Sequence, residues 1–475
     1  MRLIAYMKPY AHWVIFALLL VLGLTAFDLY RPMLVGDAID TFGANGDYDV
    51  IIATAIKYAV VLALSFAFNI AQTWILQKTG QNIILQMRKD LYRHIQSLGS
   101  RYFDITPVGK LVTRVTNDVE ALNEMYSGIL VQLFRNIVKI VGLVGVMLVL
   151  DVRLAAISFV LMPLVIGLTV LCQKIARNIY RLYRTRLTDI NTFLSEHLSG
   201  MKIIQIFGRQ ERKFEEFHDK NTKLYKAFYR EMLMYAVFRP LIYILSILSL
   251  MIVLWFGSRN VFDEIISVGT LYIFSNYIRS FFDPIQELAE QFSTLQSSIA
   301  SAEKIFTVMD EDEFIPEVEN PKQPDKITGK IEFDHVWFAY DGENYVLKDV
   351  SFVINPGEKV AFVGATGAGK SSILNLIGRY YDIQKGHIYI DGIDIRQLSK
   401  KQLRSAIGQM QQDVFIFEGD VAYNIRLNDD DITDAQVKAA AEYVNASHFI
   451  EKLPQGYHAV SYTHLRAHET LMNLV

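Results

Sequence analysis

The chain has 475 residues, of which only 20% are charged, and its mean hydropathy is +0.22. A soluble chain is nearer a quarter charged, so these values indicate a membrane part joined to a soluble part. A net charge of −3 and a pI of about 6.4 give no sign of a nucleic-acid partner. The single cysteine, Cys172, excludes an internal disulfide, and its place in an apolar run argues against a catalytic or redox role.

Six apolar runs occupy the first 300 residues, at 12–35, 51–76, 129–150, 154–172, 236–256 and 266–285. A helix of about 20 apolar residues crosses a bilayer, so the runs predict six membrane-spanning helices. No small-residue cleavage site follows the first run, which therefore resembles a spanning helix and not a removed signal. The last run is the weakest, because Ser275, Asn276 and Arg279 interrupt it.

Asp28 and Arg31 stand three residues apart in the first run, on one face of the predicted helix. Charges within a membrane are candidates for function. The run places the two residues near its outer end, where a structural pair that reaches toward the interface is the alternative. Both interpretations remain open from the sequence.

The distribution of Lys and Arg predicts the orientation. The loops after the second and fourth runs are long and basic, whereas residues 36–50 contain no Lys or Arg. Positive loops mark the cytoplasmic side. We therefore expect a multi-pass plasma-membrane protein whose N-terminus, two long loops and C-terminal part are cytoplasmic.

The two basic loops themselves have helical periodicity, at 81–97 and 177–197. The spanning helices are thus expected to continue into the cytoplasm and to turn back near 102–107 and 207–210. Their charges suit docking onto the soluble part, but a solvated face or a contact with anionic lipid is the alternative.

Composition divides the chain into a membrane domain (1–310), a polar, proline-punctuated linker (311–329) and a soluble module (330–460). The module opens with an alternating strand pattern at 331–338. A second short strand, 388–390, lies between Lys385-Gly386 and Asp391-Gly392.

Residues 364–371, Gly-Ala-Thr-Gly-Ala-Gly-Lys-Ser, fit the phosphate-loop pattern. Its glycines let backbone N–H groups converge on phosphate oxygens, and the following helix directs its positive end at the same anion. Residues 358–363 before it are expected to form a buried strand, entered through the turn 355–357, and 372–377 begin a helix. Lys370 would reach the β- and γ-phosphates, and the Ser371 hydroxyl would bind Mg²⁺. A glycine-rich surface loop is the alternative. The residues assigned here to ATP are Gly364, Gly367, Ala368, Gly369, Lys370, Ser371 and Ser372.

Together with the six runs, several segments resemble an ABC exporter half-transporter over about residues 10–458. They are 102–104 with Gly109 and 114–119, 200–205, 301–306, the phosphate loop, and 411–417 with 423–425. The resemblance implies that Tyr340 stacks on adenine and that Gln412 contacts Mg²⁺ and the attacking water. A core-packing tyrosine and a solvated loop glutamine are the alternatives. The turns near Tyr102 and Phe207 match the family's coupling helices.

The sequence departs from the family pattern after 453–457, which matches the segment that precedes a Ser-Gly-Gly-Gln signature. That signature, the strand that ends in Asp-Glu and the switch histidine are not found, and 461–475 looks like foreign sequence. We assign no catalytic residue, and no metal or catalytic role to His464, His468 or Glu469. We expect the chain as given to bind ATP without hydrolysing it at an enzymatic rate.

The expected fold is therefore a six-helix membrane domain of the ABC exporter type followed by an incomplete α/β phosphate-loop domain. The resemblance implies an ATP-driven exporter of a small molecule or lipid, paired with a second half-transporter as a homodimer or heterodimer. An ATP-gated channel, a regulatory membrane subunit and an inert fragment are the alternatives.

Overall fold

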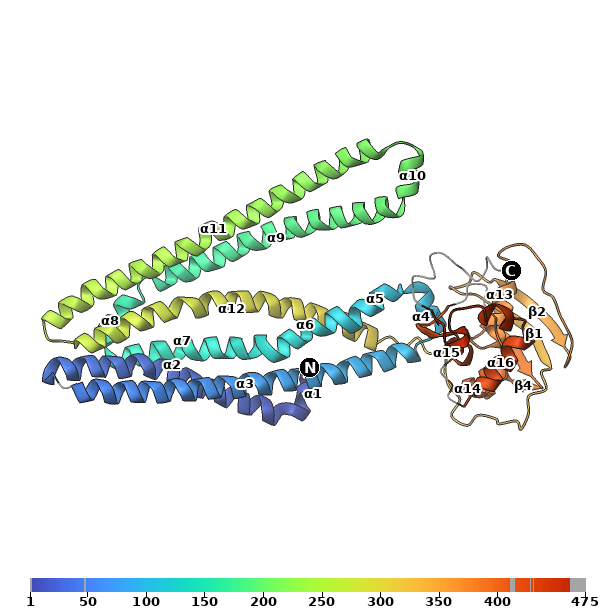
Figure 1. Cartoon of the computed structure of the whole chain (residues 1–475), viewed down its shortest axis with the longest axis horizontal. Coiled ribbons are helices and arrows are strands. Elements are labelled where there is room, and N and C mark those ends of the chain that lie inside the picture. The colour runs from blue at the N-terminus through green and yellow to red at the C-terminus, as the bar shows by residue number, and fades with distance from the viewer. Residues whose placement is uncertain (1, 47, 411–414, 428, 430, 462–475) are drawn as a thin grey trace. The chain divides into compact units, whose positions relative to one another are not determined.

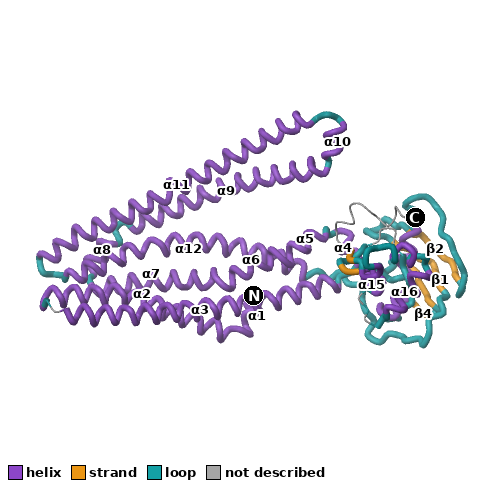
Figure 2. Tube along the Cα trace, viewed as in Figure 1, coloured by secondary structure: helices purple, strands orange, loops and turns teal. Residues whose placement is uncertain are grey.

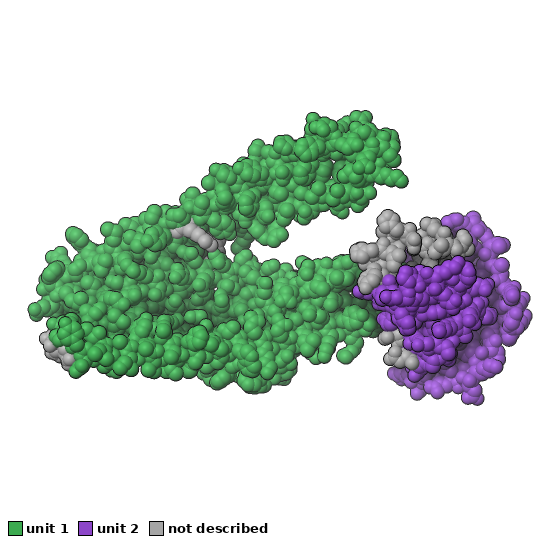
Figure 3. All heavy atoms as spheres, viewed as in Figure 1, with its two compact units in different colours: residues 1–315 green, residues 316–475 purple. Residues whose placement is uncertain are grey.

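The computed structural model describes residues 2–46, 48–410, 415–427, 429 and 431–461. It divides into two compact units, unit 1 (Met1–Ile315) and unit 2 (Pro316–Val475), coloured separately in Figure 3. Figure 2 shows that unit 1 is built from helices and that the strands belong to unit 2. Each unit is described by itself below.

Unit 1 consists of helices, six of them long and the others of six or seven residues, among the residues that the structure describes. They are α1 (Arg2–Met7), α2 (Ala11–Asn45), α3 (Tyr48–Ser97), α4 (Ser100–Ile105), α5 (Val108–Thr113), α6 (Val119–Glu124), α7 (Leu130–Leu150), α8 (Val152–Ser158), α9 (Met162–Ser199), α10 (Met201–Ile206), α11 (Gln210–Phe262) and α12 (Val268–Met309). Two π-helical turns, Arg114–Asp118 and Met125–Ile129, flank α6. At 1.5 Å per residue α11 is about 80 Å long, well beyond a bilayer core of about 30 Å.

Five segments among the described residues are long and apolar enough to cross a membrane: Arg2–Gly43, Tyr48–Ser97, Val108–Leu150, Val152–Ser199 and Gln210–Phe262. They contain the first five predicted runs. The sixth run lies in α12, which is a continuous 42-residue helix but does not reach that hydropathy. The structure therefore supports five spans and leaves the sixth as a prediction.

The fourth apolar run, 154–172, is predicted to form one helix, but the structure divides it between two helices. Residues 159–161 form a turn between α8 and α9. Pro163 occupies the first turn of α9, where its missing N–H costs nothing, whereas inside a helix continued from α8 it would leave a carbonyl of the preceding turn without its donor. The helical stretches predicted at 81–97 and 177–197 are confirmed as the ends of α3 and α9, and the chain turns back through α4 and α10 as predicted.

Apolar packing joins these helices in clusters. One cluster contains Met87 and Leu91 of α3, Leu122 of α6 and Ile305 of α12. A second unites α7, α8, α11 and α12 through fully buried residues, among them Met147, Leu154, Val253 and Phe274. Figure 1 shows α9 and α11 side by side, with α10 at the far turn.

The backbones of α2 and α12 approach each other closely at one point. A Cβ atom on Gly269 would lie 2.1 Å from the carbonyl oxygen of Gly36, so neither helix could come this near with a larger residue there. The Gly269 N–H also donates to Asp40 Oδ1 at 2.6 Å. This contact fixes the start of α12 against the end of α2.

Unit 2 contains a four-stranded antiparallel sheet in the order β2-β1-β3-β4. Its elements are β1 (Ile331–Phe338), β2 (Leu347–Ile354), α13 (Lys370–Ile377), β3 (Lys385–Ile390), β4 (Ile393–Asp394), α14 (Lys400–Ser405), β5 (Gly419–Asp420), α15 (Val421–Arg426), α16 (Asp434–Tyr443), α17 (Ser447–Ile450) and β6 (Val460–Ser461), which pairs with β5. Phe333 faces Phe352 across the sheet with stacked rings 4.5 Å apart. The strands predicted at 331–338 and 388–390 are confirmed.

The prediction of a buried strand at 358–363 is wrong. This segment is irregular, and most of its residues are exposed, including Val363 at 89%. A strand satisfies its backbone only by pairing with a neighbour. In the described part of unit 2 no strand pairs with 358–363, so its apolar composition alone does not make it one.

Residues 316–330, which we call the strap, lie along unit 2 and are hydrogen-bonded to it at intervals. Arg379 and Gln402 donate to the carbonyl oxygens of Pro316 and Pro324 at 3.0 and 3.1 Å. Lys322 N–H donates to the Gln397 carbonyl at 2.9 Å, and the Asp391 carboxylate accepts from the N–H groups of Thr328, Gly329 and Lys330.

The residues before the strap belong to unit 1. Glu313 accepts from the Gly99 N–H at 2.8 Å and pairs with Arg101 at 3.1 Å, and the Phe314 ring lies edge-on to His94. The segment predicted as a linker from its composition, 311–329, is thus divided in the structure between the two units, at Ile315 and Pro316.

Candidate functional site

The phosphate loop leads directly into helix α13, as the sequence predicted. Gly369 is the residue before α13 and has a φ of +86°, a conformation that residues with a Cβ atom rarely adopt. A Cβ atom on Gly369 would also lie 2.7 Å from the Leu347 side chain at the start of β2. Conformation and packing therefore both require glycine at this position.

Lys370, the first residue of α13, folds its side chain back over the loop. Its Nζ donates to the carbonyl oxygens of Gly364 and Ala365, each at 2.8 Å. Both of these residues are exposed, so water can replace the lysine on their carbonyls. The ammonium group is thus held at the loop by two hydrogen bonds. It can exchange them for hydrogen bonds to a phosphate at little cost in free energy, because water then binds the two carbonyls.

The donor set of this loop suits the phosphates of a nucleotide. It combines the Lys370 ammonium group with the N-terminus of α13 and the exposed residues Gly367, Ala368 and Ser371. The exposed Ser371 hydroxyl is an oxygen ligand of the kind that Mg²⁺ prefers. A Cβ atom on Gly367 would meet nothing within 4 Å, so the loop has open space above it. These residues fit a bound Mg²⁺–nucleotide.

Tyr340 lies beside the start of α13, although it is 30 residues away in sequence. Its hydroxyl is 3.0 Å from the hydroxyl of Ser372, which is buried. The ring packs edge-on against Phe338 and Tyr381, at centroid distances of 4.7 and 5.1 Å. The fold therefore brings two of the residues assigned to ATP together, while the Tyr340 ring is also part of an aromatic cluster.

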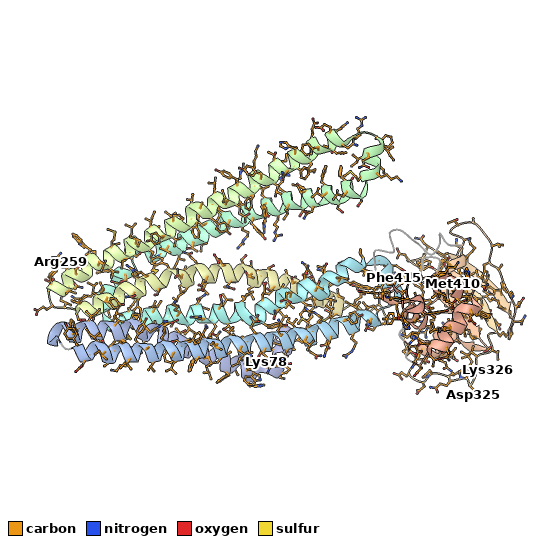
Figure 4. All side chains as sticks on the ribbon, in the orientation of Figure 1. Lys78, Arg259, Asp325, Lys326, Met410 and Phe415 are labelled. Atoms are coloured by element: carbon orange, nitrogen blue, oxygen red, sulfur yellow. The ribbon has the colours of Figure 1, made fainter. Side chains whose placement is uncertain are left out.

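Gln412 lies outside the described residues, as does the rest of 411–414. Figure 4 labels the residues on either side, Met410 and Phe415, which are 94% and 63% exposed. Phe415 packs against Phe417 with a centroid distance of 4.9 Å. Among the described residues there is no group of three His, Cys, Asp or Glu side chains placed to hold a metal.

A second polar site lies in unit 1, where Asp28 pairs with Arg31 as the sequence suggested. Arg135 of α7 also pairs with Asp28, at 3.3 Å, a partner that the sequence did not predict. The available signal was a charged residue, Arg135, within the apolar run 129–150, although the run also contains Lys139. The three residues are called the Asp28 cluster below.

The Asp28 cluster lies in the interior of two long helices. Helix α2 continues to Asn45, 17 residues beyond Asp28, and α7 continues for 15 residues beyond Arg135. At 1.5 Å per residue the cluster is about 22–26 Å from these helix ends. The helices of unit 1 are longer than a bilayer core is thick, so the place of Asp28 and Arg31 near the outer end of the apolar run stays a prediction.

Comparison with known proteins agrees with both units. Residues 14–285 match the family model described as ABC transporter transmembrane region, and residues 347–468 match the model described as ABC transporter. The chain belongs to the ABC transporter family and is a multi-pass membrane protein of the type that carries the membrane region and the ATP-binding domain on one polypeptide. The resemblance to an ABC exporter is confirmed.

The relatives are similar over most of this chain. A putative ABC transporter ATP-binding protein of Streptococcus pneumoniae is 36% identical over 458 residues, which cover 96% of this chain and 78% of that protein. A probable multidrug resistance ABC transporter ATP-binding/permease protein of Bacillus subtilis is 35% identical over 84% of this chain and 59% of its own length. An ATP-dependent lipid A-core flippase of Desulfotalea psychrophila is 30% identical over 93% of this chain and 77% of its own length.

Proposed function

We propose that this chain is the ATP-binding subunit of an ATP-driven exporter in the plasma membrane, with its N-terminus and nucleotide-binding domain in the cytoplasm. The observation that carries the proposal is the phosphate loop, where Lys370 and the N-terminus of α13 lie next to the loop backbone. The same polypeptide contains the apolar helices of unit 1. The names of the relatives, which refer to multidrug resistance and lipid A-core flipping, favour an exporter over a gated channel.

In this proposal each residue of the loop has a defined task. The backbone of 364–369 and the N-terminus of α13 bind the phosphates, and Lys370 moves from the Gly364 and Ala365 carbonyls to the β- and γ-phosphates. Ser371 and Gln412 bind Mg²⁺, which neutralises phosphate charge, and Tyr340 stacks on the adenine. The partner is a second half-transporter, either another copy of this chain or a different one.

Binding at this loop supports transport by shifting a conformational equilibrium of the membrane helices. A ligand shifts such an equilibrium only if it binds one conformation more tightly than the other. The transported compound is a small molecule or lipid. That the polypeptide of residues 1–475 binds ATP but hydrolyses it only slowly stays a prediction, to be tested by its ATPase rate.

The proposal is tested with Lys370→Ala in the purified full chain, using equilibrium binding of a fluorescent ATP analogue in the presence of Mg²⁺. Loss of the charged contact should weaken binding at least about 30-fold, which corresponds to about 2 kcal/mol. The variant should still fold, because the Gly364 and Ala365 carbonyls that it frees are exposed to water.

Lys326→Ala is the matched control, because Lys326 is an exposed lysine in the strap of the same unit, labelled in Figure 4. Its affinity should equal that of the unchanged protein. Equal affinities for Lys370→Ala and Lys326→Ala would contradict the assignment of the loop.

A further inference from the structure

The hairpin of α9 and α11 has a different charge balance in its outer and inner parts. The outer part, 186–223, contains seven basic and six acidic residues, and several of them pair, as Lys213 does with Glu216 at 2.7 Å. The inner part, 172–185 and 224–231, contains six basic residues and one acidic residue, a net charge of +5. Excess positive charge therefore collects where the hairpin meets the apolar runs.

The six basic side chains of the inner part are all exposed, and none of them pairs with an acid among the residues that the structure describes. Arg184 instead donates to the Tyr180 hydroxyl at 2.7 Å. Glu231, the acidic residue of the inner part, is half-buried. We call the six basic residues the basic collar: Lys174, Arg177, Arg181 and Arg184 of α9, with Lys226 and Arg230 of α11.

The four collar residues of α9 lie on one face, because their spacing of three, four and three residues follows the helix period. Tyr183 marks the opposite side of α9, since its ring packs against Phe228 of α11 with the centroids 5.9 Å apart. At 3.6 residues per turn, Tyr183 lies about 140° around the helix from the centre of the basic face. The basic face thus points away from α11. Side chains on a helix also tilt toward its N-terminus, which in α9 is the end within the apolar run.

The basic collar begins where the hydrocarbon core is expected to end. Lys174 and Arg184 follow the apolar run 154–172 by two and twelve residues, so at 1.5 Å per residue they stand about 3 and 18 Å beyond it. A headgroup layer is roughly 5–8 Å thick, and a further 8–10 Å or so lies within the Debye length at physiological ionic strength. Tyr180 and Tyr229, both exposed, lie in the same stretch, as tyrosines do at membrane interfaces. The collar therefore spans the depth at which lipid phosphates attract cations.

We propose that the basic collar binds the phosphate groups of anionic phospholipids, in the leaflet where α9 and α11 leave the membrane. Positive charges without acidic partners need counter-ions, and anionic headgroups present them at the depth that the collar occupies. The lipids hold the hairpin at a fixed depth, so that its outer part and α10 stand clear of the bilayer. This inference goes beyond the exporter function, because it needs only that the chain spans a membrane.

The test measures which lipid lies beside the collar in the full chain. Val170 is 62% exposed and precedes Lys174 by one turn on the same face, so Val170→Trp serves as the reporter once the four native tryptophans are changed to Phe. The chain is reconstituted in nanodiscs of equal parts phosphatidylcholine and phosphatidylglycerol, with brominated acyl chains on one lipid or the other. Brominated phosphatidylglycerol should quench the reporter as if it were enriched about fivefold, the factor that one basic residue near an anionic surface typically contributes.

Removing the charge of the basic face should abolish this enrichment. The variant combines Lys174→Gln, Arg177→Gln, Arg181→Gln and Arg184→Gln, which are exposed positions without ion pairs, so the fold is retained. In 1 M salt the unchanged chain should lose most of the enrichment as well. The matched control removes the same charge from the outer part and should keep the enrichment; it combines Lys202→Gln, Arg209→Gln, Arg212→Gln and Lys213→Gln.

Equal quenching by the two lipids in the unchanged chain would overturn the proposal, as would an enrichment that survives in the variant of the basic face or disappears in the control. If the variant of the basic face instead alters crosslinking between copies of the chain in phosphatidylcholine alone, the collar contacts a protein and the proposal is wrong. Lys370→Ala should keep the enrichment, so a failure of the proposed ATP site leaves this result unaffected.

Discussion

In unit 1 the backbone hydrogen bonds run inside long helices, whereas in unit 2 many join segments that are distant in sequence. Helix α3 pairs the N–H and C=O groups of 50 residues within one continuous segment. In contrast, β1 is paired on one side with β2 and on the other with β3, and β3 begins some 50 residues later. The first arrangement is what a membrane interior demands, because lipid offers no hydrogen bonds.

The difference explains what each unit needs in order to hold its shape. A helix of unit 1 needs apolar residues over a sufficient length, and no single side chain decides whether it forms. The elements of unit 2 are short, and they depend on single residues such as Gly369 at the phosphate loop and Asp394 after β3. We therefore expect point substitutions to affect unit 2 far more than unit 1.

The largest expected effect concerns the placement of unit 1 in the membrane. With Cys172 replaced by Ser, a cysteine at the exposed position Tyr48 should react with an impermeant maleimide added to intact cells, and one at Gln210 should not. We expect at least a tenfold difference in labelling. Permeabilised cells are the control, in which both positions should react. Labelling of Gln210 alone in intact cells would reverse the orientation.

The next largest effect is expected for Gly369→Ala. A φ of +86° and a contact of 2.7 Å with Leu347 should together destabilise unit 2 by about 2–3 kcal/mol. Trp337 is the single tryptophan of unit 2, so urea unfolding followed by its fluorescence, with Trp13, Trp74 and Trp255 changed to Phe, reports on that unit.

Gly408→Ala is the control for this variant, because a Cβ atom there meets nothing within 4 Å. It should change the free energy of unfolding by less than about 0.5 kcal/mol. If both glycine variants change the free energy of unfolding by the same amount, the stability of unit 2 does not depend on single residues such as Gly369.

A third effect concerns pH. Burial opposes ionisation of Asp394, but hydrogen bonds from Arg396 and His387 outweigh it and lower the pKa of Asp394 to about 2. Because the folded pKa lies below the ordinary value of 3.8, the ionised group stabilises the fold above about pH 4. About 2 kcal/mol should be lost as the pH falls from 5 to 2.

Trp337 fluorescence can follow this loss in urea titrations between pH 5 and pH 2. Asp394→Asn should be less stable than the unchanged protein at pH 5 and should show a smaller change with pH. Asp325→Asn removes an exposed carboxylate from the strap and should keep the original pH dependence (Figure 4). If the free energy of unfolding of Asp394→Asn falls between pH 5 and pH 2 as much as that of the unchanged protein, the pH dependence does not come from Asp394.

The smallest effect is expected at the start of α16. Thr433 and Gln436 form a reciprocal capping box, in which the Gln436 side chain accepts from the Thr433 N–H at 2.8 Å. Thr433→Ala should cost about 1 kcal/mol. Hydrogen exchange of the α16 amides should accelerate several-fold while that of α13 stays unchanged. Equal acceleration in both helices would indicate global unfolding and not the loss of a cap.

The same difference between the units sets how much the sequence could predict. The helices of unit 1 follow from hydropathy and periodicity, since their hydrogen bonds are local, and the five strongest runs were located correctly. Residues 358–363 have the composition of a strand, but whether a strand forms depends on a partner that local sequence does not reveal. The break at 159–161 could have been anticipated from Pro163.

The candidate site shows the same limit. The phosphate loop and the start of α13 were predictable, because the motif fixes a local backbone shape. The contact between Tyr340 and Ser372 and the pairing of Arg135 with Asp28 were not, since each joins helices or strands whose packing is a tertiary property. Asp28 and Arg31 were noticed as a pair because they lie on one helix.

The strap decides where unit 2 begins as a separable piece of chain. A free, flexible linker of 19 residues would have a root-mean-square length of about 24 Å. Residues 316–330 are instead hydrogen-bonded to unit 2, through Arg379 at one end and Asp391 at the other. A fragment cut at Ile331, where the sheet starts, would remove these partners from the buried Arg379 guanidinium and from the Asp391 carboxylate. The nucleotide-binding domain therefore has to be cut before Pro316 and not at its first strand.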